Sequence, residues 1–371
     1  MRNKPDDLCE IRLAAVRREI ERIGAEALLV FCLEGRNWEN VFFLSGFRGS
    51  HSVLVVGRNK VLLLTDRRYL EQAKEQASVE VADQGSDGLF VSVKKVLDGW
   101  GIGKAALEYG RISYSTALAI CEKSSIDWID GSSIVEGLRR RKSGLEAERI
   151  AEAGRICAVA LNEVLPSMKA GATEREIAAR LEFAIRMNGA EGTWGDHEFI
   201  VASGSRSVLP HGTPTAKPLE EGKWVTLDFG ARVGGYLCDI TRNVAIGRVP
   251  KKARELHELL ERAQEEAFRQ VRPGRKACEV DAAARELIGE AGYGEFFSHG
   301  LGHGLGLELH EKPRVSRFSE EVLEVGDVIT IEPGVYLNDF GGLRLEDDCL
   351  VTESGGVWLT RSIPPVFLQA P

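Results

Sequence analysis

An acid-bearing segment occurs twice in the second half of this chain. Residues 222–230 read GKWVTLDFG, and residues 326–334, which begin 104 positions later, read GDVITIEPG. Each copy is typical of a β-strand that runs into a glycine, and each places a carboxylate at its seventh position, Asp228 in the first and Glu332 in the second. The repeat therefore predicts two related halves that present matching carboxylates.

The repeat extends beyond these two strands. A second acidic strand follows each copy, with Asp239 in the first half and Glu346 in the second. Upstream, residues 145–165 and 252–271 have helical periodicity, and each run is followed by a basic turn and a second helix, matched at an offset of 103 residues. Chance similarity is the alternative, but helices, glycines and acids match together. We expect two copies of helix, helix and strands about a pseudo-two-fold axis, with a site between them.

The carboxylates of the first half need a counter-charge. If the hairpin turn centres on residues 233–234, Asp228 and Asp239 are direct cross-strand partners about 5 Å apart at Cβ. Like charges so placed destabilise a sheet unless a cation lies between them. A divalent metal pair is one explanation, and a salt bridge from Arg232 or Arg242 is the other.

The second half offers a similar arrangement. Glu332 precedes Pro333 and Gly334, where the strand must stop, and the end of a strand is a usual place for a ligand. In the segment LRLEDD, strand alternation puts Arg344 and Glu346 on one face, so the guanidinium is expected to orient the carboxylate. Two aspartates, two glutamates and one histidine match the ligand count of a two-metal hydrolytic site.

A glycine-rich segment supplies imidazoles just upstream of the second copy. His299 and His303 are four residues apart and would share one face of a strand, whereas His310 would fall on the opposite face without a bulge. His211 follows Pro210 in a predicted turn and is a candidate for contact with the substrate. The other histidines are expected to be surface or structural residues, namely His51, His197 and His257.

The front of the chain has a different pattern. Short helical and strand-like segments alternate there, which predicts an α/β domain with a mixed sheet over residues 1–135. A linker is expected at 136–144, which contains the basic run 139–142, followed by a catalytic domain at 145–371. The expected helices of the front domain are residues 11–23, 67–77, 89–97 and 116–122, and its expected strands are residues 27–32, 53–56, 61–64 and 105–107.

Composition excludes several classes of protein. A net charge of −8 without a basic stripe argues against nucleic-acid binding. Seven scattered cysteines without a CxxC pair indicate neither a disulfide framework nor a zinc ribbon, and they suit a reducing compartment. No apolar run suggests a secretion signal or a membrane span, so we expect a cytoplasmic protein that does not bind membranes.

The complete set of motifs resembles that of the pita-bread metallopeptidases. The motifs are Pro210-His211-Gly212, Asp228-Phe229-Gly230, Asp239-Ile240-Thr241-Arg242, Gly302-His303-Gly304 with His310-Glu311 and Pro313, Glu332-Pro333-Gly334, and Arg344 with Glu346-Asp347. Within that group the chain is similar to the Xaa-Pro peptidases, which carry an N-terminal α/β domain that methionine aminopeptidases lack. The resemblance covers essentially the whole chain. It implies a creatinase-like α/β domain with a mixed sheet, followed by an α+β pita-bread domain.

The resemblance also implies roles for individual residues. Two metal ions are expected, with Asp228 on one, His303 and Glu332 on the other, and Asp239 and Glu346 bridging both. Water activated by the metals would attack the scissile carbonyl with Glu332 as general base. The remaining expected site residues are His211, His299 and His310, which would hold the substrate and stabilise the tetrahedral intermediate, and Arg344. Ligands that are mostly carboxylates favour Mn²⁺, with Co²⁺ or Zn²⁺ as alternatives. The creatinases share the fold but lack these ligands.

The expected activity is that of an Xaa-Pro aminopeptidase, acting on peptides with proline at the second position. An Xaa-Pro dipeptidase (prolidase) is the main alternative, and it needs a cation for the carboxylate that comes after the proline. Only Arg206 and Arg48 are free candidates for that role, which favours the aminopeptidase. A metal hydrolase for another C–N or P–O bond, or an inactive binding module, are further alternatives. The N-terminal domain is expected to narrow the cleft and to contribute to a homodimer.

Overall fold

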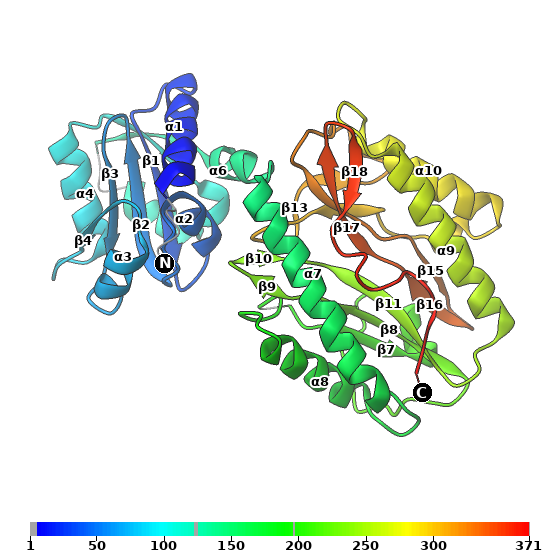
Figure 1. Ribbon diagram of the computed structural model, residues 1–371. Coiled ribbons are helices and arrows are strands. Elements are labelled where there is room, and N and C mark those ends of the chain that lie inside the picture. Colours follow the sequence, from blue (N-terminus) through cyan, green and yellow to red (C-terminus); the bar gives the residue numbers. More distant parts are fainter. Residues whose placement is uncertain (1–5, 122–124, 196, 371) are drawn as a thin grey trace. The chain divides into compact units, whose positions relative to one another are not determined.

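The computed structural model describes residues 6–121, 125–195 and 197–370 (Figure 1). Contacts between Cα atoms divide the chain into two compact units, Met1–Arg139 and Arg140–Pro371. The division falls within the expected linker at 136–144, although the first half of that linker is helical. Among the helices that are described, none is both long and apolar enough to cross a membrane.

The first unit is built on one mixed six-stranded sheet. Its strands are β1 (Ala27–Leu33), β2 (His51–Gly57), β3 (Val61–Thr65), β4 (Glu80–Asp83), β5 (Lys104–Leu107) and β6 (Asp127–Asp130), in the order β4-β3-β2-β1-β5-β6. Its helices are α1 (Asp6–Arg22), α2 (Trp38–Ser45), α3 (Leu70–Gln76), α4 (Leu89–Trp100), α5 (Tyr114–Cys121) and α6 (Ser132–Arg139), with a 3₁₀ helix at Tyr109–Arg111. Strand β1 pairs antiparallel with β2 and parallel with β5, which confirms the mixed sheet.

Burial explains the first unit's central strand. Strand β1 is almost entirely apolar and buried, as expected for a strand covered on both faces. On one face it packs with α4, whose residues Leu89, Val93 and Leu97 are spaced by four and form a single apolar stripe. Each expected helix and strand corresponds to an observed one, except that residue 122 lies outside the described part. Sequence reasoning missed α2, β4, β6 and α6, which are all short.

The second unit contains the predicted repeat. Its helices are α7 (Gly144–Val164), α8 (Glu174–Met187), α9 (Lys251–Gln270) and α10 (Ala277–Glu290), with 3₁₀ helices at Leu165–Ser167, Gly204–Val208 and Gly294–Phe296. Helices α8 and α10 each have 14 residues and start 103 positions apart. Figure 1 shows α7 beside α8 and α9 beside α10, and each pair is in contact. Both halves of the unit therefore have the same helical layer.

Two larger sheets and two two-stranded ones, β10-β9 and β15-β16, complete the described part of the second unit. The strands of the first half are β7 (Ile200–Ser203), β8 (Lys223–Phe229), β9 (Arg232–Val233), β10 (Tyr236–Leu237) and β11 (Ile240–Ile246). The strands of the second half are β12 (Gly302–Gly304), β13 (Glu311–Val315), β14 (Val328–Ile331), β15 (Gly334–Leu337), β16 (Gly341–Arg344), β17 (Asp347–Thr352), β18 (Gly355–Trp358) and β19 (Leu368–Gln369). The larger sheets have the orders β19-β11-β8-β7 and β13-β12-β14-β17-β18.

The hairpin that joins β8 to β11 corrects the predicted register. Asp228 is opposite Thr241, and Asp239 lies just before β11, so the two aspartates are not direct cross-strand partners. The turn centres on Gly234 and Gly235, whose φ angles are 55° and 87°. A two-residue turn of this kind needs positive φ at both central positions, which two glycines adopt without strain and a β-branched residue such as valine does not. Thr241 and Asp239 are two residues apart, so Asp239 is diagonal to Asp228.

The glycine-rich segment has the irregularity that the histidine spacing requires. The pairing of β12 with β13 shifts register between His303 and Gly304, which confirms the expected bulge. His299 lies before β12 and His310 before β13, so neither is inside a strand. Strand β14 ends one residue before Glu332, as the following proline predicted.

Candidate metal centre

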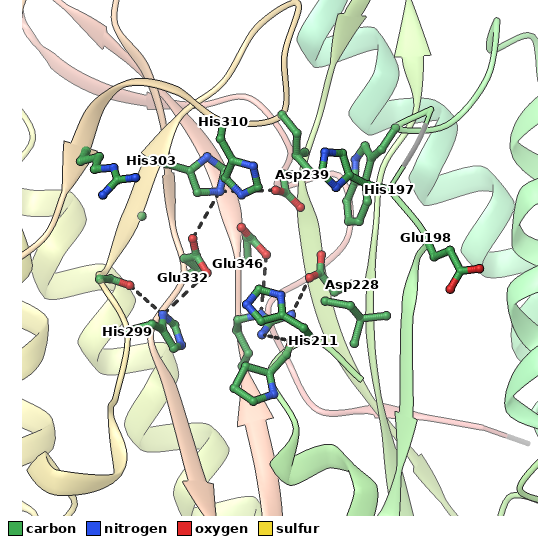
Figure 2. Close-up of a pocket in the computed structure, with 18 of the residues that line it drawn as sticks. His197, Glu198, His211, Asp228, Asp239, His299, His303, His310, Glu332 and Glu346 are labelled. Carbon is green, nitrogen blue, oxygen red and sulfur yellow. Dashed lines mark hydrogen bonds and ion pairs between the residues drawn. The ribbon is translucent and has the colours of Figure 1, made fainter. Parts of the chain in front are cut away.

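The five expected metal ligands line one cavity of about 760 Å³ within the second unit (Figure 2). They come from both halves of the repeat and from the ends of strands: Asp228 on β8, Asp239 before β11, His303 on β12, Glu332 after β14, and Glu346 between β16 and β17. The two halves of the repeat meet edge to edge where Thr241 forms a β-bridge with Glu346, and this contact brings the five positions together.

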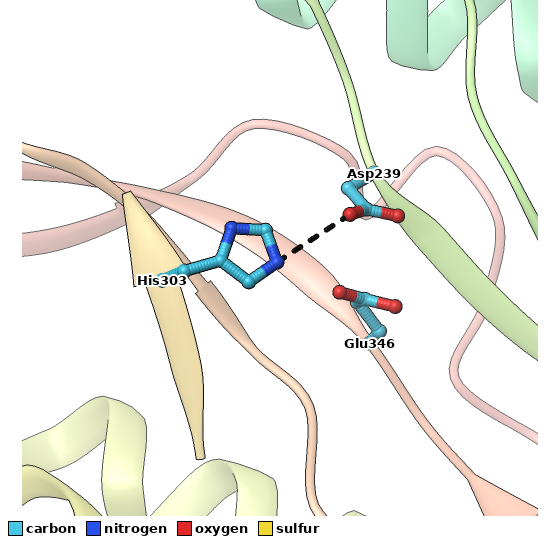
Figure 3. A group of neighbouring side chains, drawn as sticks. All are labelled: Asp239, His303 and Glu346. Carbon is cyan, nitrogen blue, oxygen red and sulfur yellow. Dashed lines mark ion pairs between the residues drawn. The ribbon is translucent and has the colours of Figure 1, made fainter. Parts of the chain in front are cut away.

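Three of these side chains form a tight group (Figure 3). Ligand atoms of Asp239, His303 and Glu346 all lie within 4.8 Å of one another. Nε2 of His303 is 3.7 Å from Oδ2 of Asp239 and 3.4 Å from Oε1 of Glu332. One imidazole nitrogen therefore faces carboxylates from both halves, as in a shared metal site.

His303 is held in the form that a metal ligand requires. Its Nδ1 lies 3.0 Å from the carbonyl oxygen of Gly304, so Nδ1 carries the proton and donates it, and Nε2 keeps its lone pair. Burial, followed by the charge of His310, lowers the pKa of His303 to about 3. The ring is neutral at pH 7 and directs a free lone pair toward the carboxylates.

The carboxylates are placed at high electrostatic cost. Burial, together with the charge of the other carboxylates, raises the pKa of Asp239 and of Glu346 well above the ordinary range. Burial also raises the pKa of Glu332 to about 8, although the charge of Arg344 opposes this. Within the described part of the chain, Oδ1 of Asp228 and Oδ1 of Asp239 are buried without a hydrogen-bond partner. Hard divalent cations bound between these oxygens would offset both the repulsion and the missing partners, so the residues fit a metal pair.

Arg344 supports the cluster differently from the sequence expectation. Its Nη2 donates to Oδ2 of Asp228 at 2.5 Å, whereas its Nε lies 3.9 Å from Oε2 of Glu346. Thr241 lies between them, because it accepts from Arg344 at 3.1 Å and donates to Glu346 at 2.6 Å. Nη1 also donates to the carbonyl oxygen of Pro210 at 3.0 Å. Arg344 thus orients Asp228 directly and Glu346 chiefly through Thr241.

His299 lies beside the acid cluster. Its Nδ1 donates to the carbonyl oxygen of Gly300 at 2.7 Å, and its Nε2 is 3.0 Å from the hydroxyl of Tyr336. The same Nδ1 is 3.9 Å from Oε2 of Glu332. Burial lowers the pKa of His299 to about 4, so the ring is neutral at pH 7. It lies close to Glu332 and lines the cavity.

Three further histidines line the cavity, namely His310, His211 and His197. The ring of His310 is 4.3 Å from that of His303 between centroids, and burial lowers its pKa. His211 is exposed in the expected turn and lines the cavity. His197 is exposed, as expected for a surface residue, but it also lines the cavity, with its ring 6.0 Å from that of His310. It lies in a loop without a periodic pattern, and no sequence signal marked it.

The structural interpretation holds for the two remaining histidines. His51 is hydrogen-bonded through Nε2 to Gln84 at 3.1 Å in the first unit. His257 is buried in α9, with its ring 5.0 Å from that of Phe367. Neither histidine lines the cavity.

The cations expected to be free are engaged elsewhere. Arg206 donates to the buried carboxylate of Glu174, and the guanidinium of Arg48 lies over two aromatic rings of the first unit. Another cation lines the cavity instead. Arg314 on β13 is the cross-strand partner of His303 on β12. Sequence reasoning missed it because the bulge in β12 hides which residue of β13 faces the histidine.

A buried ion pair shapes the loop that carries His310. Nζ of Lys142 lies 2.9 Å from Oε2 of Glu311, and both side chains are almost completely buried. Oε1 of Glu311 accepts hydrogen bonds from the backbone of Leu307 and Glu308 at 3.1 and 3.2 Å. Glu311 therefore fixes the turn that precedes His310, and Lys142 compensates its charge.

Comparison with known proteins supports this geometry. The family model described as Metallopeptidase family M24 matches residues 148–353, and the model described as Creatinase/Prolidase N-terminal domain matches residues 12–141. An Xaa-Pro dipeptidase of Pyrococcus furiosus is 39% identical over 326 residues, which cover 87% of this chain and 91% of that protein.

Solved structures give the same result. An Xaa-Pro dipeptidase from Bacillus anthracis matches with a TM-score of 0.92 and 35% identity, over 97% of this chain and 99% of that one. An X-Pro aminopeptidase from Thermotoga maritima matches with a TM-score of 0.90 and 38% identity, over 96% of this chain and 99% of that one. The expected creatinase-like N-terminal domain and pita-bread domain are thus confirmed. In sequence and in fold, this chain belongs to metallopeptidase family M24.

Proposed function

We propose that this enzyme hydrolyses the bond between a first residue and a following proline, using two divalent metal ions. One observation carries the proposal: four carboxylates and one neutral imidazole converge on a cavity, and two of the carboxylates have buried oxygens without a described partner. A side-chain nucleophile is not needed for this reaction. All seven cysteines lie outside the cavity lining that is described, and Ser316, a serine that lines it, is not hydrogen-bonded to a histidine within the described residues.

The proposed ligands follow the order of the repeat. Asp228 would hold one ion, His303 and Glu332 the other, and Asp239 and Glu346 would contact both. The predominance of carboxylate oxygens favours Mn²⁺, with Co²⁺ or Zn²⁺ as alternatives. When bound, such an ion pair lowers the pKa of a shared water and polarises the scissile carbonyl.

The protein's own groups would move the proton. Glu332 is the proposed base: its Oε1 accepts from Thr330 at 3.2 Å, and burial raises its pKa to about 8. A carboxylate in this position can take a proton from the attacking water and pass that proton to the departing proline nitrogen. His211 and His310 would donate hydrogen bonds to the substrate and to the oxygen that becomes negative in the transition state. His299, whose Nδ1 donates to Gly300, would hold the substrate by packing against it.

The length of the substrate depends on how the cavity receives the group after the proline. In an Xaa-Pro dipeptide a carboxylate comes directly after the proline ring, so a dipeptidase needs a cation close to the metals. Arg314 supplies one, because direct cross-strand partners such as Arg314 and His303 have Cβ atoms about 5 Å apart. We therefore propose the dipeptidase, with Arg314 as the carboxylate ligand. The aminopeptidase remains the second candidate, because the relative from Thermotoga maritima bears that name.

The deciding experiment compares kcat/KM for Ala-Pro and for Ala-Pro-Ala-Ala with Mn²⁺ added. A dipeptidase should prefer Ala-Pro by about tenfold or more, since a charged hydrogen bond contributes about 1.5–3 kcal/mol. Arg314→Ala should remove most of this preference, and Arg314→Lys should restore part of it as a point charge. Preference for the longer peptide, unaltered in Arg314→Ala, would favour the aminopeptidase. A phosphotriester tests for another hydrolase, and its turnover without Xaa-Pro cleavage would overturn the proposal.

A further inference from the structure

We propose that Glu198 selects substrates whose first residue is lysine or arginine. The inference rests on the proposed Xaa-Pro activity, and it names the class of first residue that the cavity accepts best. Glu198 lies in the loop between α8 and β7, lines the cavity and is exposed. Within the described ranges, which omit residue 196, its carboxylate has no ion-pair partner. It is therefore available to a charged ligand.

Opposite charges flank the acid cluster. Arg314 is on one flank, as the cross-strand partner of His303. On the other flank, Ile200 is the cross-strand partner of Asp228. Glu198 lies two residues before Ile200, roughly 7 Å further along the chain if the backbone is extended. Figure 2 shows Glu198 beyond Asp228 as seen from His303, with its carboxylate directed away from the cluster.

These positions fix the direction of the substrate. If the terminal carboxylate lies near Arg314, the proline occupies the His303 side and the scissile bond lies over the ligands. The first residue then extends past Asp228 toward Ile200 and Glu198. A carboxylate that points away from the metals is badly placed for the scissile bond but well placed for the end of a long side chain.

The wall between the metals and Glu198 suits the stem of a basic side chain. Ile200, the cross-strand partner of Asp228, lines this part of the cavity, and Trp194 and Pro210 add apolar atoms to the cavity lining. Lysine and arginine lay an aliphatic stem on such a surface and keep the charged end exposed. With Glu198 at the end of the wall, a cationic first residue gains an ion pair that a neutral residue of equal length does not.

The test uses Lys-Pro, norleucine-Pro and Glu-Pro with the Mn²⁺-loaded enzyme. Norleucine has the lysine stem without the ammonium group, so the kcat/KM ratio of Lys-Pro to norleucine-Pro isolates the charge. We expect a ratio of about two to five in the wild type, the range for a solvent-exposed ion pair. The ratio should fall toward one in Glu198→Gln, and Glu198→Lys should favour Glu-Pro instead. Added salt should also lower the wild-type ratio by screening.

The matched control is Glu182→Gln, which removes the same charge from an exposed position on α8 outside the cavity and should keep the wild-type ratio. An unchanged ratio in Glu198→Gln would overturn the inference. So would an equal loss for all three substrates, because Glu198 would then bind the α-ammonium group common to them. If the wild type cleaves none of the three dipeptides, the proposed activity itself is wrong and the inference falls with it.

Discussion

Asp239 and Glu346 are difficult to ionise without a cation, since burial and neighbouring carboxylates raise the pKa of both well above the ordinary range. Such a pair is retained only where a cation compensates it. We expect Asp239→Asn and Glu346→Gln each to bind fewer than two Mn²⁺ per chain and to lose at least about 10³ in kcat. Metal analysis of the purified variants, beside an activity assay, checks this. Two bound ions with full turnover would show that neither residue bridges the metals.

His211 provides a contrast, because it lines the same cavity but lies exposed in a turn. It should act on the substrate and not on the metal. His211→Ala is expected to lower kcat by about 10²–10³, the scale of one transition-state hydrogen bond, while metal content stays at the wild-type level. Loss of metal in this variant would instead identify His211 as a ligand.

Glu108 in the first unit gives a pH effect that is independent of the metal centre. Burial raises its pKa from 4.5 to about 7, against hydrogen bonds from Asn37 and Asn40 that lower it. Between these two values the folded protein binds more protons than the unfolded chain. The free energy of unfolding should therefore fall as pH rises through about 4.5 to 7, by an amount on the order of 3 kcal/mol, and stay low above pH 7.

The variant Glu108→Gln isolates this effect, because it does not titrate. Urea unfolding of both proteins at pH 5 and pH 8 gives the difference, with the wild type losing more stability than the variant between the two conditions. Equal losses in the two proteins would mean that Glu108 titrates alike in the folded and unfolded states.

At the scale of elements, the sequence predicted the helices better than it predicted how the strands pair. The long helices α7 and α9 and the matched pair α8 and α10 were found from the sequence, because a buried helical face repeats over many residues. The register between β8 and β11 was predicted wrongly, because register depends on which two residues form the centre of the turn. A shift of one residue in the turn moved the partner of Asp228 from Asp239 to Thr241.

The same distinction holds for the candidate site. All five proposed ligands and three of the cavity histidines were named from motifs, and the structure brings them into one cavity. Arg314 and His197 were missed. Arg314 faces His303 only because of a bulge, and His197 lies in an irregular loop, so neither position is encoded by alternation or periodicity.

The start of α8 gives a prediction at this scale. Thr173 caps the helix by accepting from the backbone of Glu176, and the side chain of Glu176 returns to the backbone of Thr173. Removing the cap leaves a helical N–H group without its partner. Thr173→Ala should lower the free energy of unfolding by about 1 kcal/mol, measured in urea, whereas Thr173→Ser should keep most of the stability. Equal stability of the alanine and serine variants would show that water replaces the cap.

At the scale of the whole molecule, each unit has its own hydrophobic core, so we expect bound metal to stabilise only the unit that contains the cavity. The first unit has its own cluster around β1 and α4, and the second has another around α9 and α10. The cavity belongs to the second unit alone. Added Mn²⁺ should raise the melting temperature of the second unit, since a ligand at about 100 times its Kd adds about 2.7 kcal/mol of stability per site. Calorimetry with Mn²⁺ and with EDTA measures this, and an equal shift of both units would mean that they unfold together.

The bridge between Thr241 and Glu346 joins the two copies of the repeat at the point where their carboxylates meet. Each copy alone holds only part of the ligand set, so metal binding should strengthen the contact between the two halves, and that contact should in turn strengthen metal binding. Without cations, the buried carboxylates on the two sides of the bridge repel each other across it. The apoprotein should then exchange its backbone amide hydrogens fastest along this line, and metal should slow that exchange by holding the two copies together.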